Sequence, residues 1–306
     1  MIDAALFELS AEVETALAEK GPVVALESSV WCQGLPRPVN YETALEMEAQ
    51  VRLGGGIPAL LWTEGGKIRC GASADELERL CADTSAIKVG AGDLPGALAS
   101  KRLGATTVSA SLAIATRLGI STFATGGIGG VHRGWSQELD ISADLQQLSR
   151  SRCLTVCTGA KSVLDIPTTL EQLESLCVPL ITFRTENFPE FYSLGKKAPF
   201  GTRLDEAGQV AQATRIALTL LDRAPLVVQC VPEEYALADK TVQEWVAAGL
   251  EAAREKKVGG KAVTPFLLSF LAERSSGQTL DANRVLLLHN AHLGGQVAAA
   301  LAKETD

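Results

Sequence analysis

Short apolar runs alternate with helical patterns along almost the whole chain, and this alternation constrains the fold more than any other feature of the sequence. Residues 22–30 (PVVALESSV) and 154–160 (LTVCTGA) have the length and composition of buried strands, whereas residues 40–53 and 280–303 have those of helices. Strands separated by helices are typical of βαβ units with a parallel sheet. We therefore expect residues 1–306 to form one compact α/β domain around a mixed, mostly parallel sheet.

Local signals predict where several elements begin and end. Asn40 precedes a helical pattern that stops before three consecutive glycines, so we expect it to cap that helix. Gly65 and Gly66 separate two apolar segments and predict a hairpin turn. The further predicted elements are a strand over 86–89, a helix over 106–118, a strand over 120–125, strands in VPLITF and PLVVQCV, and a charged surface helix over 240–257. Ligand sites in such sheets gather at the carboxyl ends of the strands.

The charge balance argues against nucleic acid as a partner. Lys and Arg total 28 against 36 Asp and Glu, which gives a formal net charge of -8. No basic stripe with interleaved aromatic residues is present in the sequence, so there is no electrostatic footprint for a nucleic acid backbone. A phosphate group on a small ligand would have to be held by local donors.

Cysteine usage and hydropathy indicate an intracellular protein. The seven cysteines include no CxxC pair, and several lie in apolar runs such as CLTVC, so we expect reduced thiols in a reducing compartment. The first 20 residues have an acidic amphipathic helical pattern rather than the layout of a signal peptide. No apolar run reaches the roughly 18 residues of a membrane span. The expected location is the cytoplasm, without a membrane partner.

The segment 125–145 (TGGIGGVHRGWSQELDISADL) carries the most information about function. The expected strand at 120–125 runs into Gly-Gly-Ile-Gly-Gly, and a backbone with few Cβ atoms can approach a ligand closely and turn its N–H groups toward an anion. The spacing fits neither the GxGxxG fingerprint nor the Walker motif. An ordinary glycine-rich turn without a ligand is an equally acceptable interpretation.

Two acids and a hydroxyl follow this loop. If DISAD begins a helix, Asp140 and Asp144 lie one turn apart on the same face, with Ser142 nearby. Such residues could cap the helix. They could equally hold a hard divalent cation through oxygen atoms and water.

Charged residues within or at the end of apolar strands are a second signal. Lys161 follows the 154–160 run, where partial desolvation favours the neutral amine that attacks a sugar carbonyl. Glu27 lies within VVALESSV, where burial favours the protonated form of a general acid. Lys88 is a third charge, in AIKV. A structural pair between Glu27 and either lysine is the alternative.

Polar residues elsewhere give weaker signals. His132 directly follows the glycine-rich loop, so a role in a site competes with an ordinary structural role. Asn283 and Asn290 share a face of the C-terminal helix, and because Asn lowers helix propensity, one of them is expected to face a ligand. His289 and His292 are expected to pack or to face solvent.

At these residues the chain resembles the pseudouridine-5′-phosphate glycosidase family, also named after indigoidine synthase A. The resemblance covers nearly the whole chain. Its motifs are VALESS, ETALEMEAQVR, GATTVSASLAIA, FATGGIGGVHRG, LDISADL, VCTGAKSVLDI, RTENFPEFY, VPEEYAL and GKAVTPFLL. The resemblance implies a three-layer α/β/α fold, assembly as a homotrimer, and reversible cleavage of the C–C glycosidic bond of pseudouridine 5′-phosphate to ribose 5-phosphate and uracil.

The resemblance also implies roles for individual residues. Lys161 matches the lysine that forms an imine-type adduct with C1′ of the opened ribose, and Glu27 matches the general acid/base. Asp140 matches the ligand of a Mn²⁺ ion, one per subunit, that is otherwise bound through water. Substrate-binding positions of the family match Lys88, Val108, Ser142, Ala143 and Asp144, and other residues around its site match Thr125, His132 and Asn283.

Two segments depart from the family pattern. Residues 31–34 are Trp-Cys-Gln-Gly where the family usually has Ile-Ser-His-Gly, and residues 90–93 are Gly-Ala-Gly-Asp where Ser-Arg-Arg-Asp is common. We expect both changes to affect the part of the site that binds the nucleobase more than the part that binds the ribose phosphate. A C-glycosynthase that joins ribose 5-phosphate to another aromatic or heterocyclic acceptor is therefore the alternative function. A sugar-phosphate sensor without catalysis is the third, although a sensor needs no nucleophile.

Overall fold

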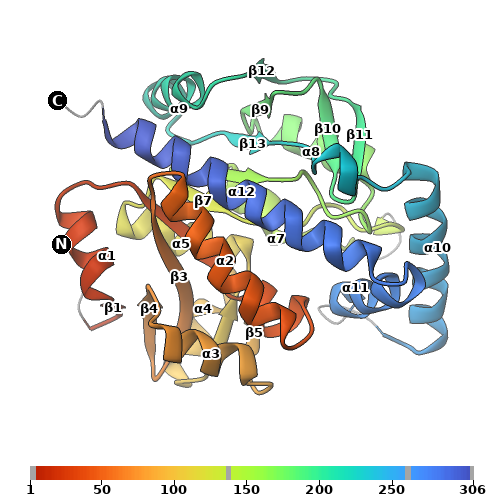
Figure 1. Ribbon diagram of the computed structural model, residues 1–306, viewed down its shortest axis with the longest axis horizontal. Coiled ribbons are helices and arrows are strands. Elements are labelled where there is room, and N and C mark those ends of the chain that lie inside the picture. The colour runs from red at the N-terminus through yellow and green to blue at the C-terminus, as the bar shows by residue number, and fades with distance from the viewer. Residues whose placement is uncertain (1–4, 136–138, 259–262, 304–306) are drawn as a thin grey trace.

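The computed structural model describes residues 5–135, 139–258 and 263–303, and these residues are built around one large sheet (Figure 1). The main path of the sheet runs β1-β4-β3-β2-β7-β8-β13-β9-β12, and β6 joins β5 to β3 beside it. All neighbours from β3 to β12 along this path are parallel, whereas β3 pairs antiparallel with β4 and β6. The expected mixed, mostly parallel sheet is confirmed. Its strands are β1 (Phe7–Leu9), β2 (Val23–Glu27), β3 (Ile57–Glu64), β4 (Lys67–Cys70), β5 (Ile87–Val89), β6 (Gly104–Thr106), β7 (Thr122–Ala124), β8 (Leu154–Cys157), β9 (Leu180–Phe183), β12 (Thr202–Leu204) and β13 (Leu226–Val228).

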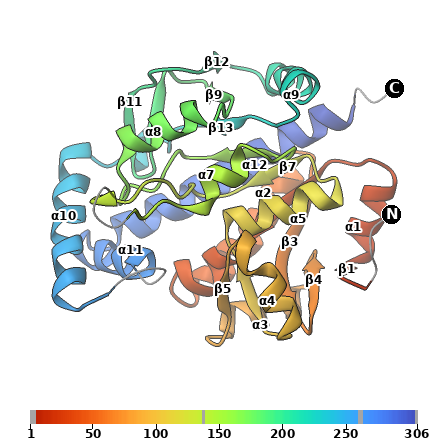
Figure 2. The ribbon, with the colours of Figure 1, turned by 180° about the vertical axis from the view of Figure 1, so that it is seen from behind.

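Helices cover both faces of the sheet, which confirms the three-layer α/β/α arrangement. The face seen in Figure 1 carries α2, α9 and α12, and the reverse view in Figure 2 shows α5, α7 and α8. Because both faces are covered, strands such as β2 and β8 are buried along their whole length. The helices are α1 (Ala11–Ala18), α2 (Val39–Leu53), α3 (Ala74–Ala82), α4 (Leu94–Ala99), α5 (Val108–Leu118), α7 (Ala143–Leu148), α8 (Ile166–Ser175), α9 (Ala207–Leu221), α10 (Asp239–Glu255), α11 (Val263–Arg274) and α12 (Gln278–Ala302).

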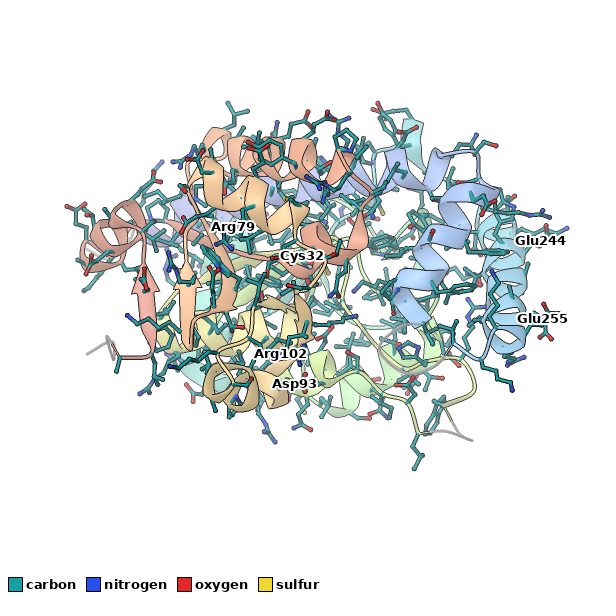
Figure 3. The ribbon with its side chains drawn as sticks, turned by 90° about the horizontal axis from the view of Figure 1, so that it is seen from below. Cys32, Arg79, Asp93, Arg102, Glu244 and Glu255 are labelled. Carbon is teal, nitrogen blue, oxygen red and sulfur yellow. The ribbon has the colours of Figure 1, made fainter. Side chains whose placement is uncertain are left out.

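Shorter elements lie at the rim. A separate antiparallel hairpin consists of β10 (Asn187–Glu190) and β11 (Ser193–Lys197). Single helical turns are η1 (Val30–Gly34), η2 (Ala91–Asp93) and η3 (Glu233–Tyr235). The charged helix expected over 240–257 is α10, and Glu244 and Glu255 point outward from it (Figure 3).

Several predicted boundaries are wrong by a few residues. The first long strand ends at Glu27 rather than residue 30, because the chain enters η1. The helix expected from 106 begins at Val108, since Thr106 is the last residue of β6. The amphipathic pattern predicted as one N-terminal helix contains β1 before α1. The hairpin turn at Gly65–Gly66 is confirmed.

Asn40 does not cap α2, because the helix begins one residue earlier and the Asn40 side chain is buried. Its amide donates hydrogen bonds to the carbonyl oxygens of Trp31 at 2.8 Å and Cys81 at 2.9 Å. The residue therefore joins α2 to η1 and α3. An amide that is buried needs such partners, and here the neighbouring elements supply them rather than the helix end.

The long helix α12 is the centre of the helical layer in Figure 1. By length and composition it could cross a membrane, but half of that stretch is buried within the protein, where it packs against α2, α9, β7 and β8. Asn290 is fully buried on its inner side and donates to the carbonyl oxygen of Thr125 at 2.8 Å. Its carbonyl oxygen accepts from Gln229 at 3.0 Å. Packing against the sheet accounts for the apolar character of this helix.

The backbones of α2 and α12 meet at a pair of glycines, Gly54 just after α2 and Gly295 within α12. A Cβ on Gly295 would overlap the carbonyl oxygen of Val51 and lie 2.9 Å from the Cα of Gly54. Side chains cannot relieve this overlap because the atoms belong to the two backbones. The crossing therefore requires glycine.

We expect Gly295→Ala to lower the free energy of unfolding by about 1–3 kcal/mol, because the added methyl group forces the two helices apart. The matched control is Gly208→Ala in α9, where a Cβ would have no neighbour within 4 Å. That substitution should stabilise the helix by at most about 1 kcal/mol. Urea unfolding followed by circular dichroism measures both, and equal effects of the two substitutions would contradict the close crossing.

Candidate active site

A cavity of about 450 Å³ lies at the carboxyl ends of β2, β5 and β8 and beside the first turn of α5. This is the sheet edge at which ligands are expected in a parallel α/β fold. The predicted site residues that line it are Glu27, Lys88, Val108, His132, Asp140, Ser142, Ala143, Asp144 and Lys161. The cavity is therefore lined by segments that are far apart in the sequence.

Glu27 is the last residue of β2 and is only 3% exposed. The hydroxyl of Ser29 donates to its Oε2 at 2.6 Å, and the hydroxyl of Thr125 donates to its Oε1. These bonds fix the orientation of the carboxyl group at the cavity wall. Thr125 is buried behind Glu27 rather than among the residues that line the cavity.

Lys161 follows β8 in a tight turn. Its backbone N–H donates to the carbonyl oxygen of Ile128 at 3.2 Å, and its carbonyl oxygen accepts from Leu164 at 3.0 Å. The turn directs the side chain into the cavity that Glu27 also lines. An amine and a buried carboxyl group therefore share one cavity, which is the arrangement that a nucleophile and its proton-transfer partner require.

Asp144 is buried, and both of its carboxylate oxygens accept backbone hydrogen bonds. The N–H of Ser109, in the first turn of α5, donates to Oδ1 at 2.9 Å. The N–H of Gly129, in the glycine-rich loop, donates to Oδ2 at 2.8 Å. A Cβ on Gly129 would overlap the Ser142 hydroxyl and approach Asp144, so glycine is required for this contact.

The Gly129 N–H is therefore not available to a ligand phosphate. The N–H groups that follow it are also used within the protein, those of Val131 and His132 donating to Thr169 Oγ1 and to the Asp140 carbonyl oxygen. The anion that the loop receives at Gly129 is the protein's own Asp144 carboxylate. The N–H groups of Gly129, Val131 and His132 are thus engaged within the protein.

Asp140 and Asp144 are not one helical turn apart, because α7 begins only at Ala143 with Ser142 as its N-cap. The Ser142 hydroxyl accepts from the Asp144 N–H at 3.2 Å. Asp140 lies in extended chain whose neighbour Ile141 pairs with Val131. The predicted capping role belongs to Ser142, and both acids reach the same cavity from different local structures.

His132 faces the Asp140 carboxylate, with 3.8 Å between Nδ1 and Oδ2. Burial lowers the pKa of His132, the negative charge of Asp140 opposes this effect, and the positive charges of Lys161 and Lys88 lower the pKa further. The neutral imidazole is therefore favoured near pH 7. The neutral His132 ring can donate one hydrogen bond and accept another.

The oxygen atoms in the cavity determine which residue could bind the expected metal ion. Asp140 has a side chain that is 44% exposed, whereas both oxygens of Asp144 are already engaged with backbone N–H groups. Within residues 5–135, 139–258 and 263–303, no group of three or more His, Cys, Asp or Glu is arranged to hold a metal. Mn²⁺ accepts carboxylate and water oxygens, so it fits this site with Asp140 as the protein ligand and water for the remainder.

Asn283 is the one predicted site residue in a different cavity. It is buried and lines a neighbouring space of about 250 Å³ between η1 and α11, together with Gln33 and Tyr192. Asn290, seven residues on, binds Thr125 and Thr158, just after β7 and β8, and lines neither of these two cavities. Ser29, which the sequence reasoning missed, was signalled only by the hydroxyl-rich run after Glu27.

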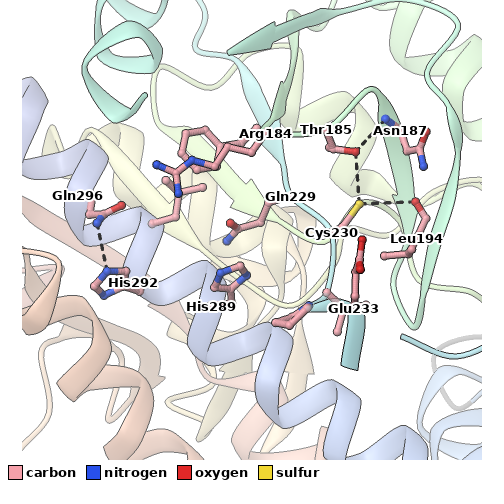
Figure 4. A pocket seen from close by; sticks show the side chains of 14 residues that line it. Arg184, Thr185, Asn187, Leu194, Gln229, Cys230, Glu233, His289, His292 and Gln296 are labelled. Atoms are coloured by element: carbon pink, nitrogen blue, oxygen red, sulfur yellow. Dashed lines mark hydrogen bonds between the residues drawn. The ribbon is translucent and has the colours of Figure 1, made fainter. Parts of the chain in front are cut away.

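A further cavity of about 410 Å³ lies at the carboxyl ends of β9 and β13, on the α12 side (Figure 4). Arg184, Gln229, His289 and His292 point into it, and Cys230 lies at its wall between Thr185 and Leu194. None of the predicted site residues lines this cavity. The two histidines of α12 are thus remote from the Glu27 and Lys161 cavity.

Comparisons with known proteins give a consistent result. The model of the family described as indigoidine synthase A like protein matches residues 12–300. The chain is 45% identical over 303 residues to a pseudouridine-5′-phosphate glycosidase of Symbiobacterium thermophilum, covering 97% of this chain and 98% of the relative. It is 42% identical over 297 residues to a pseudouridine-5′-phosphate glycosidase of Caldanaerobacter subterraneus, covering 97% of both chains.

Solved structures share the fold along the whole chain. The prealnumycin C-glycosynthase AlnA in complex with ribulose 5-phosphate has a TM-score of 0.89 and 37% identity, with 98% of both chains covered. An indigoidine synthase A-like protein from Thermotoga maritima has a TM-score of 0.89 and 35% identity, with 99% of both covered. Fold, sequence and the shared motifs agree: this chain belongs to the family of indigoidine synthase A like proteins.

Proposed function

We propose that this protein reversibly cleaves the C–C glycosidic bond of pseudouridine 5′-phosphate, with water, to give ribose 5-phosphate and uracil. The observation that carries the proposal is the placement of Lys161 and buried Glu27 around one cavity at the carboxyl edge of the sheet. The relatives that bear the name pseudouridine-5′-phosphate glycosidase, at 42–45% identity, support the same substrate.

Because uracil C5 leaves with the bonding electrons, C1′ becomes electron-deficient, and breaking this C–C bond requires a group on C1′ that donates electrons. In the proposed path the neutral amine of Lys161 bonds to C1′ as the C1′–O4′ bond breaks, and O4′ takes a proton. The nitrogen lone pair then forms a C=N bond while C5 of uracil leaves with the bonding electrons and takes a proton. Water hydrolyses the imine, which releases ribose 5-phosphate and restores the amine.

Glu27 is the proposed proton donor and acceptor in these steps. Its burial and its two hydroxyl partners, Ser29 and Thr125, keep the carboxyl group in one orientation. A positioned group of this kind contributes more than a mobile one, because proton transfer requires hydrogen-bond distance. His132, favoured as the neutral imidazole, is proposed to bind the substrate beside it.

The phosphate is proposed to bind at Lys88 and the first turn of α5, where Val108 lies. The Asp144 carboxylate already accepts the Ser109 N–H at this end of α5, so Lys88 is the proposed source of positive charge for the phosphate. Ser142, Ala143 and Asp144, which line the same cavity, are proposed to contact the sugar. We further propose that Asn283 contributes from the neighbouring cavity.

Asp140 is the proposed ligand of one Mn²⁺ per subunit, with water as the other ligands. When bound, the ion would supply positive charge next to the sugar phosphate. We also propose, from the resemblance to the family, a homotrimer in the cytoplasm with residues 1–306 as a single domain. The partner is a small sugar phosphate or nucleotide.

The alternative is a C-glycosynthase that attaches ribose 5-phosphate to another aromatic or heterocyclic carbon. Two observations favour considering it: the likeness to prealnumycin C-glycosynthase, and the small residues Gly90, Ala91 and Gly92 at the cavity wall. A Cβ on Gly92 would have no neighbour within 4 Å, so this wall leaves room for a larger acceptor.

Trapping tests the lysine adduct. We expect borohydride added with ribose 5-phosphate to leave a reduced sugar phosphate on the peptide that contains Lys161, because an imine is reduced to a stable amine. Peptide mass spectrometry locates the adduct. Lys161→Met should abolish it, and Lys240→Met, on the exposed surface of α10, should not. Sugar phosphate that binds without any adduct on the wild-type protein would instead support a sensor.

Uracil release separates the two enzymatic functions. With Mn²⁺ present, the wild-type protein should release uracil from pseudouridine 5′-phosphate, measured by chromatography. Chelation of the metal, or Asp140→Asn, should reduce the rate, because the charge beside the sugar phosphate is lost. A folded, metal-loaded sample that forms the lysine adduct but releases no uracil would favour the C-glycosynthase.

Glu27→Ala should abolish measurable uracil release, and Glu27→Gln should reduce kcat by about 10²–10⁴-fold, since both remove the proton donor. Borohydride trapping at Lys161 should remain possible in both variants, because the amine is intact. Glu244→Gln on the exposed face of α10 is the matched control and should have the wild-type rate. Wild-type turnover by Glu27→Gln would remove the assigned role.

A further inference from the structure

Arg133 and its neighbour His132 face different cavities. His132 lines the 450 Å³ site cavity, whereas Arg133 lines a separate cavity of about 620 Å³ behind it, together with Asp165, Glu190 and Gln243. Leu164 lines both cavities. The turn that begins at Lys161 therefore forms the wall between the two spaces, and Arg133 lies on its far side.

The guanidinium of Arg133 is bonded to this wall. Its Nε donates to the carbonyl oxygen of Leu164 at 3.3 Å, and Nη2 donates to the carbonyl oxygen of Ser162 at 3.1 Å. The same turn is closed by the Leu164 N–H on the Lys161 carbonyl oxygen at 3.0 Å. Leu164 also pairs with His132 in an isolated bridge. One guanidinium thus ties the His132 segment to the turn that carries Lys161.

The other side of the guanidinium is held from α10. Arg133 Nη2 donates to Gln243 Oε1, and the Gln243 amide donates to Glu190 Oε2 and Asp239 Oδ1, each at 3.3 Å. The Ser162 hydroxyl donates to the Glu190 carbonyl oxygen. The network thus connects the Lys161 turn to β10 and α10, two elements that contribute no side chain to the site cavity.

The environment of Arg133 is specific for a guanidinium. Burial lowers the pKa of Arg133, and the negative charges of Asp165, Glu190 and Asp239 oppose this effect. Burial of a charge is costly unless hydrogen bonds and counter-charges compensate it. Two backbone carbonyls and an amide oxygen match the planar fork of Arg, whereas the ammonium of Lys is a point donor on a flexible stem.

We propose that Arg133 is a positioning residue that sets the Lys161 amine and the His132 ring by holding the 161–164 turn from the side opposite the substrate. The inference rests on the proposed function of Lys161. Arg133 does not line the site cavity, so its proposed effect is on the geometry of the groups that do. A displacement of about 1 Å at such groups can cost about 100-fold in rate.

The test compares Arg133→Lys and Arg133→Ala with wild type for kcat, KM, trapping at Lys161 and thermal unfolding. Both variants should lose about 100-fold in kcat, because the nucleophile is misplaced, and KM should rise by a smaller factor, because the displaced His132 ring is a proposed substrate contact. Methylguanidinium should restore part of the activity of Arg133→Ala by entering the cavity behind the turn. Gln243→Met should show a smaller loss in the same direction. Arg254→Met, at an exposed site on α10, is the control and should equal wild type.

A readout without substrate separates this inference from the proposed function. Trinitrobenzenesulfonate labels accessible neutral amines, and peptide mass spectrometry gives its rate at Lys161. A changed labelling rate at Lys161 in Arg133→Lys supports the positioning role. This holds even if the wild-type protein releases no uracil, a result that would contradict the proposed function but not the positioning role. Wild-type kcat and labelling in Arg133→Lys would overturn the inference. The inference would also be overturned if methylguanidinium did not restore the kcat of Arg133→Ala and the shift in thermal unfolding fully explained the lost activity.

Discussion

The burial of one carboxylate, that of Asp144, holds the site together. Its two oxygens accept the N–H of Ser109 at the start of α5 and the N–H of Gly129 in the glycine-rich loop. Hydrogen bonds to a charged acceptor are stronger than neutral ones, and a buried N–H left without a partner is costly. Because Asp144 itself belongs to α7, three separate elements are fixed relative to one another, and the cavity between them keeps its shape.

The acid and the amine of the proposed reaction are placed by different means. Glu27 ends a strand that is buried along its whole length, and two hydroxyl groups fix its carboxyl group. Lys161 lies on a turn that a sheet alone would hold less firmly. The Arg133 guanidinium supports that turn from a second cavity, and α10 supports Arg133 through Gln243. Elements remote from the substrate therefore contribute to the geometry of the site.

Most of the fold could be predicted because the strands and helices carry strong local patterns. The β2 strand, the β3–β4 hairpin and α12 were all identified from apolar periodicity and turn residues. Short polar residues carry weaker local signals. Asn40 has the composition of a cap yet joins three elements by buried hydrogen bonds, and Asp140 precedes α7 rather than beginning it. Such side chains bond to whichever backbone groups packing brings near.

By itself the sequence determined the α/β class, the parallel sheet and the ordered motifs that carry Glu27 and Lys161, because these depend on residue types at neighbouring positions. Only the tertiary structure decided that the Gly129 N–H donates to the Asp144 carboxylate, that Asn283 lies in a separate cavity, and that Arg133 supports the Lys161 turn. The first and the third of these outcomes depend on hydrogen bonds between groups 15 to 110 positions apart in the chain. Periodicity carries no information on which distant donor and acceptor will be packed together.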